Sequence, residues 1–462
     1  MNDALVARSA ELHRLGNSLR DVGRVSEAIG RYREALALAP DNLDAHRDLL
    51  VAAVFSPDWS SDERFAEHQR FARRFSPASR GAGYDGTPAD PDRRLRIGYL
   101  SCNFANHPVG RNLGPLLFER DRQAFEVHCF AEVDHPDAFG RQLLDAADGW
   151  VRTTGQSDAD VAATIAAKRI DILVVLAGHL DRNRLLVAAH RPAPIQISYH
   201  DAATSGLADM DYLLADRILC PPGGSERFTE RLLRLPSLVY MQPPANAPAV
   251  RPRSRNGGPV FACCNAPAKV TGAVAATWAG ILKAVPRSRL VLRHRDAYAD
   301  PACQESVSAA FAGHGIAPGR IDFRGAPQDH PLAIYHDVDV TLDPFPFSGS
   351  TVTFESLWMG VPVVTLPGDT MIGRWSAAIL SAIGQSNCVA ADKKQYVDIA
   401  VALAENQTRL NTLRCQLRGR VQSSSLCNGR RKTVQVERLF RAAWVRFCSC
   451  AHGERAALSH KF

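Results

Sequence analysis

The stretch VDVTLDPFPFSGSTVTFESLWMGVPVVTLPG, residues 338–368, predicts the fold more directly than any other part of the chain. It begins with a short β-rich run and passes through a turn cluster of Pro, Gly and Ser. A run with apolar residues at helical spacing follows and closes at Gly360. The apolar run VPVVTLPG then predicts a second, buried strand. This order of strand, polar loop, helix and strand is typical of an α/β protein with a parallel sheet.

The helix inside this stretch begins next to hydroxyl groups. Ser350 and Thr351 stand at its predicted start, and Glu355 lies four residues after Thr351, on the same helix face. A helix N-terminus presents unpaired N–H groups and the positive end of the helix dipole, so this loop is suited to a diphosphate. The glutamate could then accept hydrogen bonds from a ribose. The alternative is an ordinary turn in which Ser and Thr only cap the helix.

The composition is typical of a soluble globular protein. The length of 462 residues suggests two to four domains, with 46% hydrophobic and 22% charged residues. We expect a cytoplasmic protein without a membrane span, because no apolar run is long enough and the N-terminus lacks a signal-peptide core. The eleven cysteines follow no disulfide framework and are expected to be reduced. The net charge of +7 is spread along the chain, and no pattern indicates nucleic-acid binding.

Residues 10–42 have the spacing of a tetratricopeptide (TPR) repeat. The matching positions are Leu15, Gly16, Gly23, Ala28, Tyr32, Ala35, Leu36 and Pro40. Because one repeat cannot bury its apolar face alone, it must pack on further helices, on the next domain or on a partner. We expect a TPR-like helical region over residues 1–77 and a linker rich in Gly, Pro and Asp over residues 78–94.

Two sets of alternating strands and helices follow and predict two doubly wound, Rossmann-like domains, at residues 95–250 and 251–400. Residues 401–462 predict basic helices that pack back on these domains. The predicted strands are RLRIGYLS, FEVHCFAEV, IDILVVLAG and IQISYH, then PVFACCN, RLVLRH, RIDFRGA, VDVTLD, VPVVTLPG and CVAAD. Ligands bind at the carboxyl ends of parallel strands, so we expect the loops there to face a cleft between the two domains.

Four of these loops carry polar side chains, in addition to the helix start at Ser350. They are residues 101–110 with His107, 177–184 with His179, 263–269 with Asn265 and Lys269, and 324–330 with Gln328 and His330. A lone histidine after a strand is more often structural, but five such loops indicate a shared site. A lysine and a helix N-terminus can hold a leaving diphosphate without a metal, and a histidine can orient an acceptor or move a proton.

Other nucleotide chemistries are disfavoured by the motifs. No D-x-D run stands where a metal–diphosphate site would be expected. The chain has no Walker A sequence and no G-x-G-x-x-G after a strand, which argues against an NTPase and against a dinucleotide-dependent dehydrogenase. Group transfer from a nucleotide is the chemistry that the loops favour.

At these loops, and over nearly its whole length, the chain resembles the O-linked N-acetylglucosamine transferase family, particularly bacterial members with short repeat regions. The resemblance rests on RLRIGYLSCNFANHP, IDILVVLAGH, HRPAPIQISY and LDPFPFSGSTVTFESLWMGVPVVTLPGD. It implies a GT-B architecture and an inverting, metal-independent glycosyltransferase. Such an enzyme would move a sugar, N-acetylglucosamine, from a UDP-sugar to Ser or Thr hydroxyls of proteins. The repeat region would help to recruit the acceptor protein, and no cofactor is expected.

The resemblance also implies roles for the site residues. His107 would be catalytic and lie beside acceptor and sugar, while Lys269 would be catalytic and neutralise the diphosphate. The nucleotide-sugar would contact Asn265, Ala326 (backbone to uracil), Gln328, His330 (near the base), Ser350 and Thr351 (diphosphate) and Glu355 (ribose). A candidate sugar or acceptor loop would comprise His179, Thr204, Ser205 and Gly206, and no residue would bind a metal. The acceptor's proton would go to His107 or to the donor's own phosphate.

The chain departs from the family around the sugar. Residues 199–206 read YHDAATSG, where the family usually has Leu-Gly-Tyr-Pro and a Thr-x-Gly segment, and Asn103, Ala266 and Val352 replace polar or acidic residues common in the family. Two alternatives follow. One is a catalytically weak or inactive TPR/GT-B scaffold that binds a protein partner. The other is a transferase that uses another nucleotide sugar on a bacterial surface protein such as flagellin. Retention of His107, Lys269 and Glu355 together favours an enzyme.

Overall fold

The computed structural model describes residues 3–78, 90–253, 257–327 and 329–459. It divides into two compact units. Unit 1 comprises Met1–Arg64, Ile218–Glu226 and Pro243–Cys427, and unit 2 comprises Phe65–Arg217, Arg227–Gln242 and Asn428–Phe462. Each unit contains one parallel sheet with helices, and a short helical region precedes the sheet of unit 1. The fold class is therefore the predicted one, α/β of the GT-B type with two doubly wound Rossmann-like sheets.

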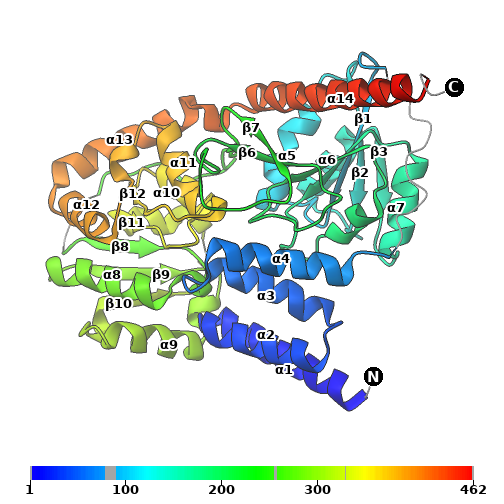
Figure 1. Ribbon diagram of the computed structural model, residues 1–462. Helices are drawn as coiled ribbons and strands as arrows, with labels where there is room; N and C mark the ends of the chain where they lie inside the picture. Colours follow the sequence, from blue (N-terminus) through cyan, green and yellow to red (C-terminus); the bar gives the residue numbers. More distant parts are fainter. Residues whose placement is uncertain (1–2, 79–89, 254–256, 328, 460–462) are drawn as a thin grey trace. The chain divides into compact units, whose positions relative to one another are not determined.

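The helical region of unit 1 contains α1 (Asp3–Asp21), α2 (Val25–Leu38) and α3 (Leu43–Phe55), which stack in chain order (Figure 1). At Gly16 a Cβ atom would lie 2.5 Å from Cε1 of Tyr32, so only glycine lets α1 and α2 approach this closely. Gly23, with a φ of +89°, forms the turn between them. The predicted helix pair is confirmed. The helix α4 (Ser61–Phe75) follows and carries the boundary between the units.

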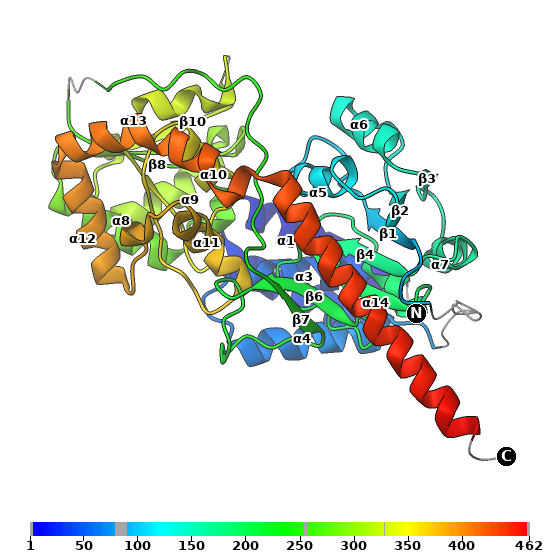
Figure 2. The same cartoon turned by 90° about the horizontal axis from the view of Figure 1, so that it is seen from above.

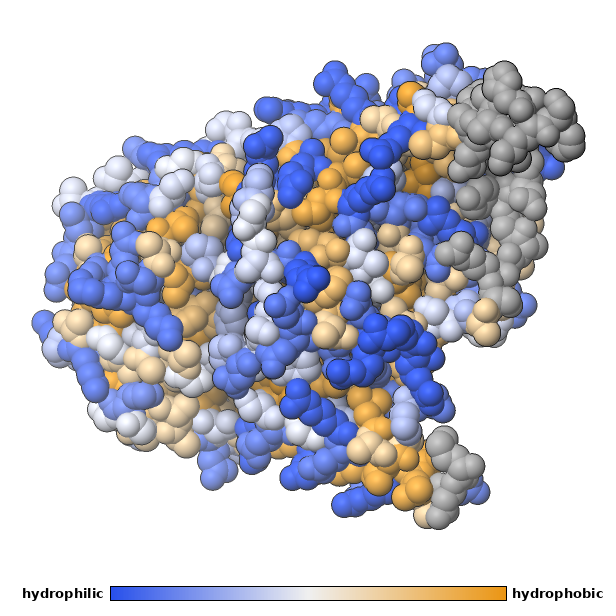
Figure 3. Space-filling view, in the orientation of Figure 1, coloured by the Kyte–Doolittle hydropathy of each residue, from blue (hydrophilic) through white to orange (hydrophobic). Residues whose placement is uncertain are grey.

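The N-terminal end of α1 presents apolar side chains to solvent. Leu5 and Val6 are each 41% exposed, and Figure 3 shows an apolar patch at this end of the helix. Leu15, further along α1, is 45% exposed. The repeat thus buries one face of α1 and leaves apolar groups on another.

The remaining elements of unit 1 form a five-stranded parallel sheet in the order β10-β9-β8-β11-β12. The strands are β8 (Val260–Cys263), β9 (Arg289–Arg293), β10 (Ile321–Arg324), β11 (Val340–Leu342) and β12 (Val363–Val364). The helices are α8 (Gly272–Ala284), α9 (Pro301–Ala312), α10 (Thr351–Trp358), α11 (Trp375–Ala382), α12 (Lys393–Glu405) and α13 (Gln407–Ser423). Gly360, with a φ of +79°, ends α10 as the sequence predicts.

Unit 2 contains a seven-stranded parallel sheet in the order β3-β2-β1-β4-β5-β6-β7. Its strands are β1 (Leu95–Ser101), β2 (Phe125–Ala131), β3 (Gly149–Arg152), β4 (Ile172–Leu176), β5 (Ile195–Tyr199), β6 (Tyr212–Asp216) and β7 (Arg231–Leu235). The helices α5 (Pro108–Phe118), α6 (Ala138–Ala146) and α7 (Asp158–Ala167) connect them. The last helix, α14 (Gly429–Ser459), is unbroken (Figure 2) and packs on α5, with its Phe440 and Trp444 buried.

Several predicted elements differ from the structure. The segment CVAAD is not a strand, because its Val389 makes only an isolated bridge with Thr365. The segment is apolar because its residues Cys388 and Ala390 are buried. The strand predicted in VPVVTLPG is confined to β12, since the prolines on either side lack the N–H that a ladder needs. The segment NRLLVAAH forms a 3₁₀ helix, Leu185–His190. The strands β3, β6 and β7 were not predicted, and most of the predicted linker, residues 79–89, lies outside the described residues.

No helix in the described ranges is both long enough and apolar enough to cross a membrane.

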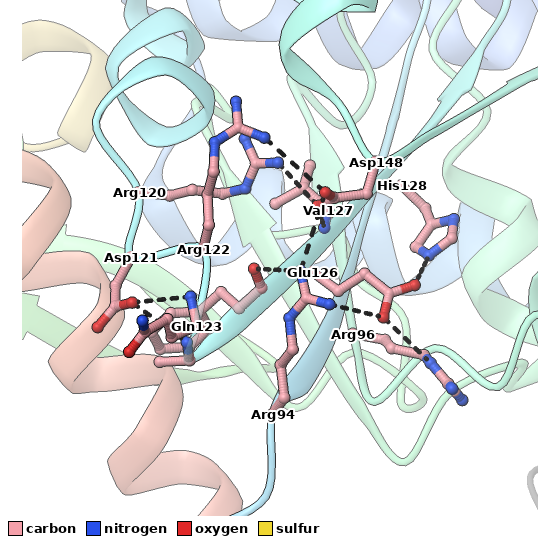
Figure 4. Close-up of polar contacts among 12 residues, drawn as sticks. Arg94, Arg96, Arg120, Asp121, Arg122, Gln123, Glu126, Val127, His128 and Asp148 are labelled. Atoms are coloured by element: carbon pink, nitrogen blue, oxygen red, sulfur yellow. Dashed lines mark hydrogen bonds and ion pairs between the residues drawn. The ribbon is translucent and has the colours of Figure 1, made fainter.

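Charged side chains join the amino ends of β1, β2 and β3, at the opposite edge of the sheet from the predicted site loops (Figure 4). Arg120 is buried and donates to the carbonyl oxygens of Leu117 at 2.6 Å and Ala146 at 2.7 Å. It also donates to Asp148 Oδ2 at 2.7 Å, and the same carboxylate accepts from the backbone N–H of Val127 at 2.7 Å. The buried guanidinium of Arg120 thus links the segments before β2 and β3 by hydrogen bonds.

We expect Arg120→Met to lower the free energy of unfolding of unit 2 by about 3 kcal/mol, because the Leu117 carbonyl and the Asp148 carboxylate each lose a hydrogen bond from a buried charged donor. Arg122 is the matched control: it lies 3.9 Å from the same carboxylate, but its side chain is 57% exposed. Arg122→Met should cost less than about 1 kcal/mol. Urea titrations followed by tryptophan fluorescence measure both, and equal losses would contradict a special role for the buried arginine.

Candidate active site

In unit 1 the predicted site loops follow two neighbouring central strands. The order β10-β9-β8-β11-β12 reverses between β8 and β11, since the chain proceeds outward from β8 in one direction and from β11 in the other. Ligands of doubly wound sheets bind at this switch point, beyond the carboxyl ends of the strands. Lys269 follows β8, and the helix start at Ser350 follows β11. The topology therefore brings these two predicted groups to one place.

Lys269 links the two loops. It ends the short 3₁₀ helix Pro267–Lys269, and its Nζ donates to the carbonyl oxygen of Ser348 at 2.8 Å and to Asn265 Oδ1 at 3.1 Å. The Nζ also lies 4.0 Å from the ring centroid of Phe347. Burial lowers the pKa of Lys269 to about 8, while the nearby Asp343 carboxylate acts in the opposite direction. Near neutral pH the side chain is thus mostly a cation whose two hydrogen-bond acceptors are neutral.

Asp343, which the sequence analysis did not single out, shapes the loop after β11. It is buried and accepts from the backbone N–H of Gly349 and from Thr365 Oγ1, each at 2.7 Å. Burial raises its pKa, and hydrogen bonds to the carboxylate oppose this shift. A Cβ on Gly349 would lie 2.8 Å from Asp343 Oδ1, so the loop requires glycine there. The sequence feature that could have identified Asp343 was its place directly after a predicted strand, which is the feature that identified the residues of the other loops.

The helix α10 starts at the position that the sequence predicts, and anion binding there stays a prediction. Ser350 is the N-cap residue, but its side chain makes no capping hydrogen bond within the described structure. The alternative in which Ser350 only caps the helix is therefore not supported. Thr351 is the first helical residue. Glu355 lies one turn further along, and its charge, after the larger effect of burial, helps raise the pKa of Cys264 to about 11. The carboxylate is thus close to the end of β8.

The other predicted nucleotide contacts lie on the loop after β10, which β9 separates from β8. Ala326 is exposed, and its N–H donates to Asp296 Oδ1 at 2.8 Å. His330 precedes the 3₁₀ helix Pro331–Asp337, and its Nδ1 accepts from the N–H of Leu332 at 3.1 Å. Gln328 lies outside the described residues. The nucleotide-binding role of this loop stays a prediction.

In unit 2, His107 and His179 also follow strands at a switch point, between β1 and β4. His107 is the N-cap residue of α5, and its Nδ1 accepts from the N–H of Val109 at 3.4 Å. Its Nε2 lies 3.9 Å from Asp181 Oδ2, on the loop after β4. Asn103 donates to the same carboxylate at 2.9 Å. The histidine is half-buried, with one ring nitrogen directed toward a carboxylate that could orient it or stabilise its charged form.

The candidate sugar or acceptor loop is held inside unit 2 by Glu230. The carboxylate accepts from Thr204 Oγ1 and from the N–H of Ser205, each at 2.7 Å, and also from Ser205 Oγ. His179 Nε2 lies 3.0 Å from the carbonyl oxygen of Ser205. Gly206 has a φ of +76° and packs against the backbone of α4. All these residues are buried, which favours a packing role, while their contact with a substrate stays a prediction.

Within the described residues, no three or more His, Cys, Asp or Glu side chains are grouped so that they could hold a metal ion.

Comparison with known proteins adds a family match. Residues 82–245 and 253–436 match the model of glycosyl transferase family 41. The chain is 33% identical over 429 residues to "Probable UDP-N-acetylglucosamine--peptide N-acetylglucosaminyltransferase SPINDLY" of Solanum lycopersicum, covering 89% of this chain and 45% of that protein. It is 30% identical to the Arabidopsis thaliana protein of the same description named SEC, covering 77% of this chain and 38% of that protein. The chain thus spans about half the length, or less, of these curated relatives.

A solved structure is similar over most of both chains. It is a mutant of Thermobaculum terrenum O-GlcNAc transferase, with a TM-score of 0.91 and 36% identity. The match covers 96% of this chain and 85% of that one.

The lowered pKa of Lys269 can be measured directly. A neutral amine reacts with acylating reagents and an ammonium does not, so labelling of Lys269 should rise with a midpoint near pH 8. Lys394 is an internal control, because its pair with Asp398 at 2.7 Å raises its pKa above the usual value. Its labelling should therefore rise only at a clearly higher pH than that of Lys269. Peptide mass spectrometry reads both sites in one sample, and a shared midpoint would contradict the burial of Lys269.

Proposed function

This chain belongs to glycosyl transferase family 41, and we propose that it is a protein O-GlcNAc transferase. It moves a sugar, N-acetylglucosamine, from a UDP-sugar to Ser or Thr hydroxyls of proteins, with inversion and without a metal ion. The likeness to the Thermobaculum transferase, over most of both chains, is the observation that carries the proposal. The cation of Lys269 at the switch point of unit 1 supports it independently.

The chemistry follows from the groups in each unit. The acceptor hydroxyl attacks the anomeric carbon, the bond from that carbon to the diphosphate oxygen breaks, and UDP leaves with the bonding electron pair. Lys269 and the N-terminus of α10 stabilise the negative charge that develops on UDP. Glu355 holds the ribose, and the loop after β10 contacts the base. The acceptor's proton goes to His107 or to the donor's phosphate.

The acceptor protein is recruited by the helical repeat. The exposed apolar side chains Leu5, Val6 and Leu15 on α1 support this part of the proposal, because a protein segment can cover them. The chain acts in the cytoplasm, which is supported by its eleven cysteines, all free thiols.

Replacing Lys269 tests the nucleotide site. Lys269→Ala should lower transfer by at least about 100-fold, because the leaving group loses a charge contact in the transition state. UDP binding should weaken with it, while the melting temperature stays near that of the wild type. Lys283→Ala, at an exposed lysine on α8, is the matched control and should leave transfer unchanged.

The assay uses UDP-N-acetylglucosamine with peptide libraries and contains a chelator throughout. UDP-glucose, GDP-fucose and CMP-linked sugars serve as competing donors. Near-normal turnover by Lys269→Ala would remove the lysine from the mechanism. Loss of all transfer in the chelator would contradict a metal-independent mechanism. A preference for another donor would contradict N-acetylglucosamine as the transferred sugar.

Replacing His107 tests the acceptor side. His107→Asn keeps a residue that caps helices well, so α5 should form normally. We expect transfer to fall by about 100-fold or more, as for a lost general acid or base, and the Kd for UDP to change by less than about twofold. A parallel loss of UDP affinity would instead place His107 in nucleotide binding.

A further inference from the structure

A stack of side chains connects the helical repeat to Lys269 inside unit 1. Phe55 is the last residue of α3, and its ring centroid lies 4.7 Å from that of Phe347, with an angle of 22° between the planes. Phe347 in turn lies against Lys269, whose Nζ is 4.0 Å from the ring centroid. The next residue, Ser348, provides the carbonyl that accepts from Lys269 at 2.8 Å. The stack therefore runs from the repeat to the ammonium group.

The repeat also packs on the residues just before Lys269. A Cβ on Gly23 would lie 3.1 Å from the carbonyl oxygen of Pro267. Ala268 is 6% exposed and belongs to the apolar cluster of the repeat, with Val25, Ala28, Ile29, Tyr32, Leu49, Ala52, Ala53 and Trp59. Both loops that hold the ammonium group, after β8 and after β11, thus rest on α1–α3.

We propose that Phe55 is a positioning residue: it holds the Phe347 ring against Lys269 and so fixes the orientation and hydration of the cation that receives the diphosphate. An ammonium group has three N–H donors, of which two go to Ser348 and Asn265, leaving one for a phosphate oxygen. The Phe347 ring excludes water from one side of the ammonium group, and its π-electron face attracts the positive charge. The inference rests on the proposed function, because it takes the diphosphate of UDP as the ligand.

Loss of the Phe55 ring has a defined electrostatic consequence. Burial is the main cause that lowers the pKa of Lys269 to about 8. If Phe347 loosens and water reaches the ammonium group, the group becomes less buried and its pKa rises. Within the described residues, Asp343 and Cys263 act on Lys269, and Lys269 acts on His294; all three lie at or just after the carboxyl ends of strands of unit 1. None of these lies in the repeat, so a change in α3 reaches Lys269 through Phe347 rather than through a new charge.

The experiment compares the full-length chain with Phe55→Ala by two measurements. The first is the pH midpoint of amine labelling at Lys269, which should move upward from about 8 in the variant. The second is calorimetric UDP affinity between pH 7 and 9, above the last phosphate pKa of about 6 and below the ionisation of the uracil N3–H. Only protonated Lys269 favours the diphosphate, so wild-type affinity should stay level below pH 8 and fall above it, up to about tenfold per pH unit.

In Phe55→Ala the decline should begin at higher pH, and affinity at pH 7 should be about threefold to tenfold weaker, because the loop must be ordered on binding. Phe55→Tyr keeps the stacked ring and should restore both values. Leu49→Ala is the matched control, since it removes a buried side chain of the same helix that belongs to the core of the repeat. It should lower stability and leave the midpoint of Lys269 unchanged.

The outcomes separate the two proposals. An unchanged labelling midpoint in Phe55→Ala, or an equal shift in Leu49→Ala, overturns the positioning role whatever UDP does. A shifted midpoint in Phe55→Ala alone supports it. If the midpoint shifts but the wild type binds no UDP, the positioning of Lys269 stands and the proposed function fails.

Discussion

The hydrogen bond from Lys269 Nζ to the carbonyl oxygen of Ser348 is the interaction on which the site in unit 1 depends. It joins the loops after β8 and β11, where the strand order of the sheet reverses. Without it, the cation on one loop and the helix N-terminus on the other would lose the direct hydrogen bond that joins them. With it, both sources of positive potential are held at the same edge of the sheet, where an anion gains from each.

Holding an ammonium group in this position is unfavourable for the isolated protein. Burial penalises the charge, and the Asp343 carboxylate offsets part of that penalty. The two direct acceptors, Ser348 O and Asn265 Oδ1, are neutral, so they orient the cation without cancelling its charge. A poorly hydrated cation with a fixed direction loses little solvation when a phosphate arrives. The same features that lower its pKa therefore suit it to stabilise a leaving diphosphate.

The sequence predicted the parts of this site that depend on position along a strand. Each loop could be placed at the carboxyl end of a strand, because periodicity and turn residues mark where strands stop. Contacts between distant residues leave no such mark: Lys269 and Ser348 are 79 positions apart, and nothing in PFPF distinguishes Phe347 as the partner of Phe55. The same limit explains the segment CVAAD, whose apolar residues are buried without joining the sheet.

The packing of the repeat changes how its role should be understood. A TPR-like segment that only recruited an acceptor protein could be removed without consequence for the donor site. Here α1–α3 belong to the same compact unit as the sheet that carries Lys269, and Ala268 is part of their core. Removing them would expose Pro267, two residues before Lys269, and the Phe347 ring that lies against its ammonium group. In unit 1 the helices that are candidates for binding an acceptor protein thus also support the groups that are candidates for binding the donor.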